Sequence, residues 1–375
     1  MIECCRIPGI GNAPDAVWSP LVERDRGRLI GWRKARNIRV LRGEGAVQQH
    51  RVGIVGFGPV GSILGAYLVR CGMKVYGVEL AETRAEQVNR DGLLIRGFAE
   101  LQEKPERCFS SLAELSEVKD LSVVFVCTKT WALLDLMKTF TSLEWPEPMR
   151  VVAAMNGIGP EDLIGEHFPK GRICRGVINY AGNQSPDGWT TMNWFHPPNL
   201  FGPATERSPE RMNEVADLLT QAGLTSISVN HYEMKKAAFY KTVLNSALNA
   251  LCAAHGLTMA RAMHLKHTRR TARVLLREGL TVAGLVGYNY GEDALDRCLE
   301  YLEGGGDHHP SMWFDLKDRR PTEIEYINGK IVKIGSMFMG VDVSHNLYFT
   351  SAIVTQEIKN GTRDDDDIPE YLIDS

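Results

Sequence analysis

A glycine-rich turn between an apolar strand and a helix places the strongest limit on the fold of this chain. The segment RVGIV, residues 51–55, has the character of a buried strand, and GFGPVGS follows it at residues 56–62. A helical pattern then runs to Arg70. In such a turn Gly56 permits a tight bend, Gly58 leaves the backbone open to a close neighbour, and Gly61 lets the helix pack near the strand. The segment therefore predicts a strand–turn–helix unit.

Further strands and helices alternate after this unit. The apolar segments MKVYGVE (73–79), LSVVFVC (121–127) and RVVAA (150–154) are typical of strands buried in a parallel sheet. A helical pattern at residues 83–90 follows the first of them. This alternation predicts a doubly wound α/β domain of the Rossmann type over residues 50–230.

The second half of the chain lacks strand patterns from His231 onward. Helical patterns occupy residues 233–254, 260–286, 291–302 and 322–339. We therefore expect the α/β domain to be followed by an all-α domain over residues 231–362.

The two ends of the chain differ from the middle. Residues 1–49 are rich in Gly, Pro and Arg without sustained periodicity, and they lack the apolar core of a signal peptide. We expect a poorly ordered extension there. Residues 363–375 contain a run of four Asp, which repels itself, and we expect an acidic, solvated tail.

Composition excludes several classes of protein. The net charge of -3, without a long basic tract, argues against a nucleic-acid surface. No apolar run approaches the roughly 20 residues that cross a bilayer. The eight cysteines are scattered and form no CxxC pair, so we expect a reducing compartment, no disulfide and no metal site.

The glycine turn also predicts a ligand. Amide groups at the start of the helix can hold a pyrophosphate, and a dinucleotide would then contact the loop residues Gly56, Phe57, Gly58, Pro59, Val60 and Gly61. Glu79 ends the second strand, 18 residues after Gly61. A carboxylate there commonly binds the adenosine ribose hydroxyls and repels a 2′-phosphate, which favours NAD.

A polar stripe interrupts an otherwise apolar helical pattern in YKTVLNSALN, residues 240–249. Lys241, Asn245 and Asn249 recur at steps of four, so they share one face of the expected helix. The helix stays apolar or small through Ala254. Such a stripe is usually a solvated face, but if it is buried, its ammonium and amides need partners.

A second candidate group lies further along the chain. Ser311 begins SMWFD, and Glu323 stands in RPTEIEYINGK. Glu323 is expected near the first turn of the 322–339 helix, with Thr322 or Asp318 as a cap. From spacing alone, Glu323 reads as a first-turn glutamate favoured by the helix dipole.

From Arg51 to about Asn346 the chain resembles the ketopantoate reductase family, the 2-dehydropantoate 2-reductases. The matching segments are GFGPVGS with LGAYL, VNRDGLLIRG (88–97), VCTKT (126–130), MNGIG (155–159), YKTVLNSALNALCA (240–253) and SMWFDLKDRRPTEIEYINGKIV (311–332). The last two are the most specific.

The resemblance implies roles for individual residues. Lys241 aligns with the catalytic lysine of the family, and Glu323 aligns with the acid that positions it and contacts the substrate. Substrate-binding positions align with Asn156, Asn245, Asn249 and Ser311, and Lys129 and Asn156 fall on the cofactor side. The stripe is then expected to face a cleft between the domains, where the substrate and Glu323 satisfy it.

Departures from the family pattern leave alternatives open. The resemblance favours NADP, whereas Glu79 favours NAD, and Arg84 could reach a 2′-phosphate. The segment NWFHPPN, 193–199, is bulkier than its counterpart in the family and could reshape the substrate pocket. A structural or surface role is expected for His196, and loop positions are expected for His308 and His309.

These observations predict a cytoplasmic oxidoreductase, monomeric or homodimeric, that reduces a 2-oxo acid with NAD(P)H. 2-Dehydropantoate, in pantothenate biosynthesis, is the first choice of substrate. A different branched or aromatic 2-oxo acid is the alternative within this class. A non-catalytic dinucleotide-sensing protein is the alternative outside it.

Overall fold

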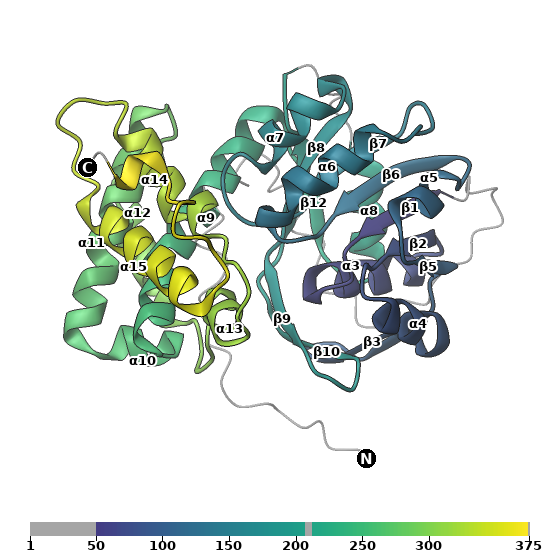
Figure 1. Ribbon diagram of the computed structural model, residues 1–375, viewed down its shortest axis with the longest axis horizontal. Coiled ribbons are helices and arrows are strands. Elements are labelled where there is room, and N and C mark those ends of the chain that lie inside the picture. Colours follow the sequence, from purple (N-terminus) through teal and green to yellow (C-terminus); the bar gives the residue numbers. More distant parts are fainter. Residues whose placement is uncertain (1–49, 207–211, 374–375) are drawn as a thin grey trace, which may run out of the picture.

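The structure is a computed structural model that describes residues 50–206 and 212–373. The extension expected at residues 1–49 lies outside the described residues. An α/β part occupies one side of the molecule and a helical part the other (Figure 1). This is the Rossmann-type domain followed by an all-α domain that the sequence predicts.

The main sheet has eight strands in the order β12-β11-β8-β7-β6-β1-β2-β5. All neighbouring pairs are parallel except β11 with β8. Its strands are β1 (Arg51–Val55), β2 (Lys74–Val78), β5 (Arg107–Phe109), β6 (Leu121–Val126), β7 (Arg150–Ala153), β8 (Ile173–Val177), β11 (Asn199–Pro203) and β12 (Ser226–Ser228). Both faces are covered, as the apolar strands require.

A second sheet has four strands in the order β4-β3-β10-β9. It packs against helix α3 (Pro59–Arg70), on the side of α3 that faces away from the main sheet. Its strands are β3 (Leu93–Gly97), β4 (Leu101–Glu103), β9 (Tyr180–Gln184) and β10 (Trp189–Phe195). Local sequence patterns do not predict this sheet, because β3 and β10 pair across almost 100 residues of chain.

The remaining elements of the α/β part are short helices around the main sheet. They are α4 (Glu82–Asp91), α5 (Leu112–Ser116), η3 (Thr130–Ala132), α6 (Leu133–Thr141), α7 (Pro160–His167), η4 (Lys170–Arg172) and α8 (Asn213–Gln221). Side chains of α5, α6 and α7 form one apolar core with the face of the sheet opposite α3.

Helix α9 (His231–His255) is the central element of the helical part. It begins at Asn230, whose side chain accepts a hydrogen bond from Glu233 N at 2.9 Å, and it ends at Gly256 with φ 65°. Most of its side chains are buried on all sides, which is typical of a helix in a core.

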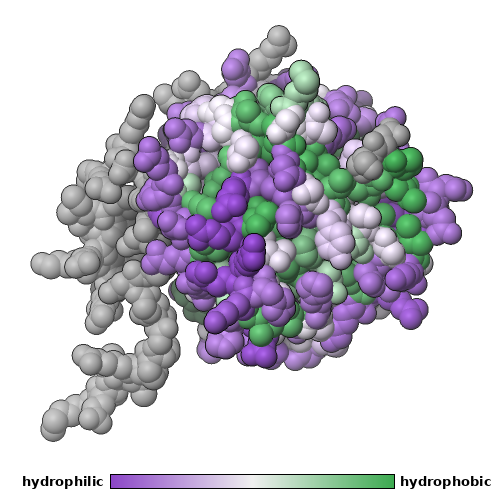
Figure 2. Space-filling model, turned by 90° about the vertical axis from the view of Figure 1, so that its left-hand side faces the viewer, coloured by the Kyte–Doolittle hydropathy of each residue, from purple (hydrophilic) through white to green (hydrophobic). Residues whose placement is uncertain are grey.

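Other helices surround α9. They are α10 (Met259–His264), α11 (Lys266–Leu285), α12 (Ala294–Glu303), α13 (Ser311–Lys317), η5 (Ile324–Tyr326), α14 (Asn328–Gly335), α15 (Ser344–Asn360) and η6 (Glu370–Leu372). The outer face of this part is mostly polar with smaller apolar areas between (Figure 2). Within the described residues, no helix combines the length and apolar character that a membrane span requires.

Two of the predicted helices are longer than the helices in the structure. The 260–286 pattern is divided at Leu265, whose backbone is extended. The 322–339 pattern is divided at Ile327 (φ -108°, ψ -94°), so Glu323 precedes a short 3₁₀ turn and does not lie in the first turn of a long helix. Thr322 does act as a local cap, since its hydroxyl accepts from Ile324 N at 3.2 Å.

Residues 363–373 are acidic, as expected, but they also pack against the helical part. The four Asp, residues 364–367, are exposed. Arg363, however, binds the buried carboxylate of Glu357 at 2.8 Å and Glu325 at 2.6 Å, and Tyr371 lies against Gly329. Residues 363–373 are therefore not simply a solvated tail.

Candidate active site

The glycine loop has the shape that its sequence predicts. Gly56 takes φ 92°, and a Cβ on Gly61 would lie 2.0 Å from the Gly56 carbonyl oxygen, so neither position accepts a side chain without a shift. A Cβ on Gly58 would meet nothing within 4 Å. The start of α3 is thus open beside Gly58, with Pro59 at its first position.

Glu79, directly after β2, turns toward this loop. Its Oε2 accepts a hydrogen bond from Phe57 N at 3.1 Å. Arg84, one candidate for binding a 2′-phosphate, donates to Gln87 Oε1 at 2.9 Å and to Gly188 O at 3.1 Å. The carboxylate therefore lies at the loop, and the guanidinium reaches the same loop, since its Nη2 donates to Ser62 Oγ at 3.5 Å.

The polar stripe of α9 lines a cavity of about 520 Å³. Lys241 and Asn245 are partly buried, and Asn249 is 8% exposed. The opposite wall comes from the second sheet, with Phe98 after β3 and Trp194 on β10. The stripe is thus neither a solvated face nor a closed core, but one wall of a cavity between the two parts of the molecule.

The amine of Lys241 is the most perturbed group in this cavity. Its Nζ donates to Ile178 O. Burial, reinforced by the positive charge of Arg175, lowers the Lys241 pKa to about 7, while the negative charge of Glu323 opposes the shift. The lysine can therefore exchange a proton near neutral pH.

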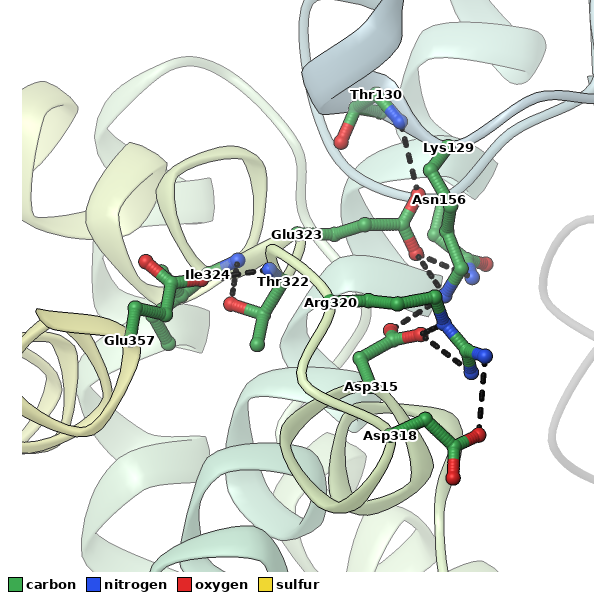
Figure 3. Close-up of polar contacts among 10 residues, drawn as sticks. All are labelled: Lys129, Thr130, Asn156, Asp315, Asp318, Arg320, Thr322, Glu323, Ile324 and Glu357. Atoms are coloured by element: carbon green, nitrogen blue, oxygen red, sulfur yellow. Dashed lines mark hydrogen bonds and ion pairs between the residues drawn. The ribbon is translucent and has the colours of Figure 1, made fainter. Parts of the chain in front are cut away.

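Glu323 connects the helical part to the α/β part (Figure 3). Its carboxylate accepts from Thr130 N at 3.3 Å and from Asn156 Nδ2 at 3.4 Å, and it lies 3.5 Å from Lys129 Nζ. The family resemblance implies that Glu323 pairs with the ammonium of Lys241. The structure gives it these partners instead, and Lys241 bonds a carbonyl of the α/β part.

Asp315 also contacts Lys129, and no local sequence pattern identifies it as part of this cluster of charges. It is 2% exposed, and its Oδ2 lies 2.6 Å from Lys129 Nζ, while Arg320 approaches Oδ1 at 3.3 Å (Figure 3). Burial raises the pKa of Asp315 against the opposing effect of Lys129. Burial would lower the Lys129 pKa, but Glu323 and Asp315 together raise it, so Lys129 stays charged. The signal available in the sequence was the SMWFD segment.

The remaining candidate residues are Ser311 and three histidines. Ser311 is exposed at the start of α13 and does not line the cavity. His196 and His308 do line it. His196 Nδ1 lies 3.0 Å from the Tyr301 hydroxyl, and its ring stacks on Trp194 at 4.6 Å. His309 stacks on Trp313 at 3.7 Å, away from the stripe.

Comparisons with known proteins match both parts of the chain to one family. Residues 52–199 match the family described as Ketopantoate reductase PanE/ApbA, and residues 233–357 match its C-terminal domain. A curated 2-dehydropantoate 2-reductase from Archaeoglobus fulgidus is 27% identical over 304 residues, which cover 79% of this chain and 94% of the relative.

Two solved structures share the fold. A ternary structure of D-mandelate dehydrogenase with NADH and anilino(oxo)acetate has a TM-score of 0.71 at 22% identity, covering 83% of this chain and 99% of that one. A 2-dehydropantoate 2-reductase from Geobacter metallireducens has a TM-score of 0.72 at 22% identity, covering 81% and 98%. With both halves matched in order, the chain belongs to the ketopantoate reductase family.

Proposed function

We propose that this protein uses NADH or NADPH to reduce a 2-oxo acid to a 2-hydroxy acid. The observation that carries the proposal is the Lys241 amine, which has a pKa of about 7 and lines a cavity together with Asn245 and Asn249. A proton donor beside directional amides is the set of groups that reduction of a carbonyl beside a carboxylate requires.

The glycine loop fits a dinucleotide. The open space beside Gly58 leaves room for a pyrophosphate at the start of α3, and the contact between Gly61 and Gly56 O keeps the loop tight. We assign Gly56, Phe57, Gly58, Pro59, Val60 and Gly61 to this binding, with Glu79 at the adenosine ribose.

The chemistry assigned to the chain is proton transfer and positioning. The bound reduced nicotinamide would supply the hydride to C2 of the substrate. Lys241 donates its proton to the carbonyl oxygen as that oxygen gains negative charge, which completes the 2-hydroxy acid. Asn245 and Asn249 hold oxygen atoms of the substrate, while Asn156 and Glu323 position the groups around them.

2-Dehydropantoate is the first substrate to test, because the curated relative is named for it. The cavity wall favours a second candidate, an aromatic 2-oxo acid. Trp194 and His196 come from the bulky 193–199 segment and stack together, and Tyr301 meets His196 edge-on at 5.3 Å. Burial lowers the His196 pKa, so this wall is uncharged at neutral pH and suits a flat apolar group.

The test is oxidation of NADH or NADPH in the presence of 2-dehydropantoate, phenylglyoxylate and a branched 2-oxo acid, each compared with the Lys241→Ala protein. Trp194→Ala should reduce the specificity constant for phenylglyoxylate more than that for 2-dehydropantoate if the aromatic wall binds substrate. Coenzyme binding without turnover on any 2-oxo acid would contradict the proposal and favour a sensing role.

The same proposal includes a cytoplasmic location and a monomer or homodimer in solution. Light scattering of the purified protein measures the second point directly.

A further inference from the structure

Arg175 is a buried cation in the middle of the main sheet. It lies on β8 beside Ala153, the last residue of β7, and is 2% exposed. A buried arginine is costly unless other groups compensate its charge and its donors. Its contacts therefore indicate what it does there.

The guanidinium bonds both sides of a single turn. Its NH2 donates to Met155 O at 2.7 Å and to Gly157 O at 2.9 Å, the two carbonyl groups that flank Asn156. The turn also meets the helical part, since Ile158 N donates to Tyr326 O at 2.9 Å. A single nitrogen of the guanidinium, Nη2, thus holds the backbone from which the Asn156 side chain reaches Glu323.

Arg175 also belongs to a buried charge cluster. Its NH1 lies 3.3 Å from Glu161 Oε2, and Lys235 Nζ lies 2.8 Å from Glu161 Oε1. Burial would raise the Glu161 pKa, but Arg175 and Lys235 outweigh it and lower that pKa. Glu161 is 1% exposed, so this carboxylate stays charged in the core and pairs with both cations.

The strand that carries Arg175 also supports Lys241. Ile178, one residue after β8 ends, provides the carbonyl that accepts from Lys241 Nζ. The charged groups that act on Lys241 are Arg175 from β8 and Glu323 from the helical part. His196 and His308 share the cavity, and burial lowers the pKa of each, so neither adds a positive charge at neutral pH.

We propose that Arg175 is a positioning residue of the active site, which fixes the turn that carries Asn156. The inference rests on the proposed reductase function and adds to it a residue outside the cavity lining. The bonds of Arg175 to the turn and the effect of its positive charge on Lys241 separate experimentally, because the bonds depend on the shape of the guanidinium and the charge role does not.

The first variant, Arg175→Lys, keeps the charge, but its single nitrogen cannot hold both carbonyls and Glu161 at once, as Nη2 and Nη1 of the arginine do. Turnover should fall by about 10-fold or more because Asn156 loses its fixed position. The pH at which activity is half lost should stay near that of the wild type. Unchanged turnover would overturn the positioning role.

The second variant, Arg175→Met combined with Glu161→Gln, removes the charge without leaving a buried carboxylate unpaired. The midpoint of activity loss with rising pH should move up, because one of the two causes that lower the lysine pKa is gone. Lys235→Met is the matched control: it removes the other cation from Glu161 and should leave the midpoint unchanged.

A readout independent of catalysis separates this inference from the proposed function. Reductive methylation with ¹³C formaldehyde and NMR titration gives the pKa of the Lys241 amine, with its signal assigned by its loss in Lys241→Arg. An upward shift in the double variant supports the charge role even if no 2-oxo acid is reduced. An unchanged titration in a folded double variant, as judged by thermal melting, would refute it.

Discussion

Replacement of Glu79 by Gln tests the coenzyme site by a change of charge alone. The carboxylate accepts a hydrogen bond from Phe57 N at 3.1 Å, and a glutamine oxygen can accept the same bond. The position of the side chain at the glycine loop should therefore persist. What disappears is the negative charge that would face the 2′-position of a bound adenosine ribose.

The magnitude follows from the exposure of this side chain. Two unit charges in contact at a partly exposed site interact by about 1 to 4 kcal/mol. Glu79 is only partly buried, so the lower part of that range applies. A change of about 1.4 kcal/mol corresponds to a tenfold shift in the ratio of specificity constants toward NADPH. Arg84 offsets part of this repulsion, because its positive charge lies near Glu79 and its guanidinium reaches Ser62 of the loop.

The assay compares kcat/KM for NADH and NADPH in the two proteins at one low ionic strength, because salt weakens the effect. We expect the wild type to use both coenzymes with a modest preference for NADH. Glu82→Gln is the matched control: it makes the same charge change on an exposed residue of α4. A hundredfold wild-type preference for NADPH, or an unchanged ratio in Glu79→Gln, would show that Glu79 does not face the ribose.

Four further predictions concern the reaction and the stability of the chain. Lys241→Ala should lower turnover by about 100-fold or more while coenzyme affinity, measured by fluorescence titration, stays near normal. Since reduction needs the protonated amine, wild-type activity should be present below pH 7 and fall as the pH rises through the Lys241 pKa of about 7; a level pH profile would exclude it as the acid. Glu323→Ala should reduce both turnover and substrate affinity, whereas Asn249→Ala should act mainly on substrate affinity; equal affinities in both variants and the wild type would place the substrate elsewhere. Arg363→Met leaves the fully buried Glu357 without its cation and should cost about 3 kcal/mol of unfolding free energy; an unchanged Tm would contradict a structural role for this end of the chain.

Local patterns in the sequence predicted those parts of the fold that depend on local interactions. The glycine loop after β1 and the stripe on α9 are set by residues within a few positions of one another, and both appear where expected. The second sheet could not be predicted in this way, since β3 and β10 each need a distant partner before their pairing is visible.

Contacts between distant residues also limit what the sequence predicts about the candidate site. Spacing identified the stripe of Lys241, and the family resemblance pointed to Glu323, but neither could show that Glu323 bonds Thr130 and Asn156. Arg175 was missed because a single arginine in an apolar strand carries no periodic signal. Its role depends on two carbonyls about 20 residues earlier in the chain.

The position of Glu323 has a consequence for how the molecule loses activity. Its carboxylate contacts Thr130, Asn156 and Lys129 in the α/β part, while its own backbone belongs to the helical part. A rotation of one part against the other would separate these groups together with Val177 and Leu200 of the main sheet, which belong to the same apolar core as α9. Heat or denaturant should therefore abolish turnover in the same transition that separates the two parts, and an assay of activity alongside circular dichroism at each temperature measures whether the two losses coincide.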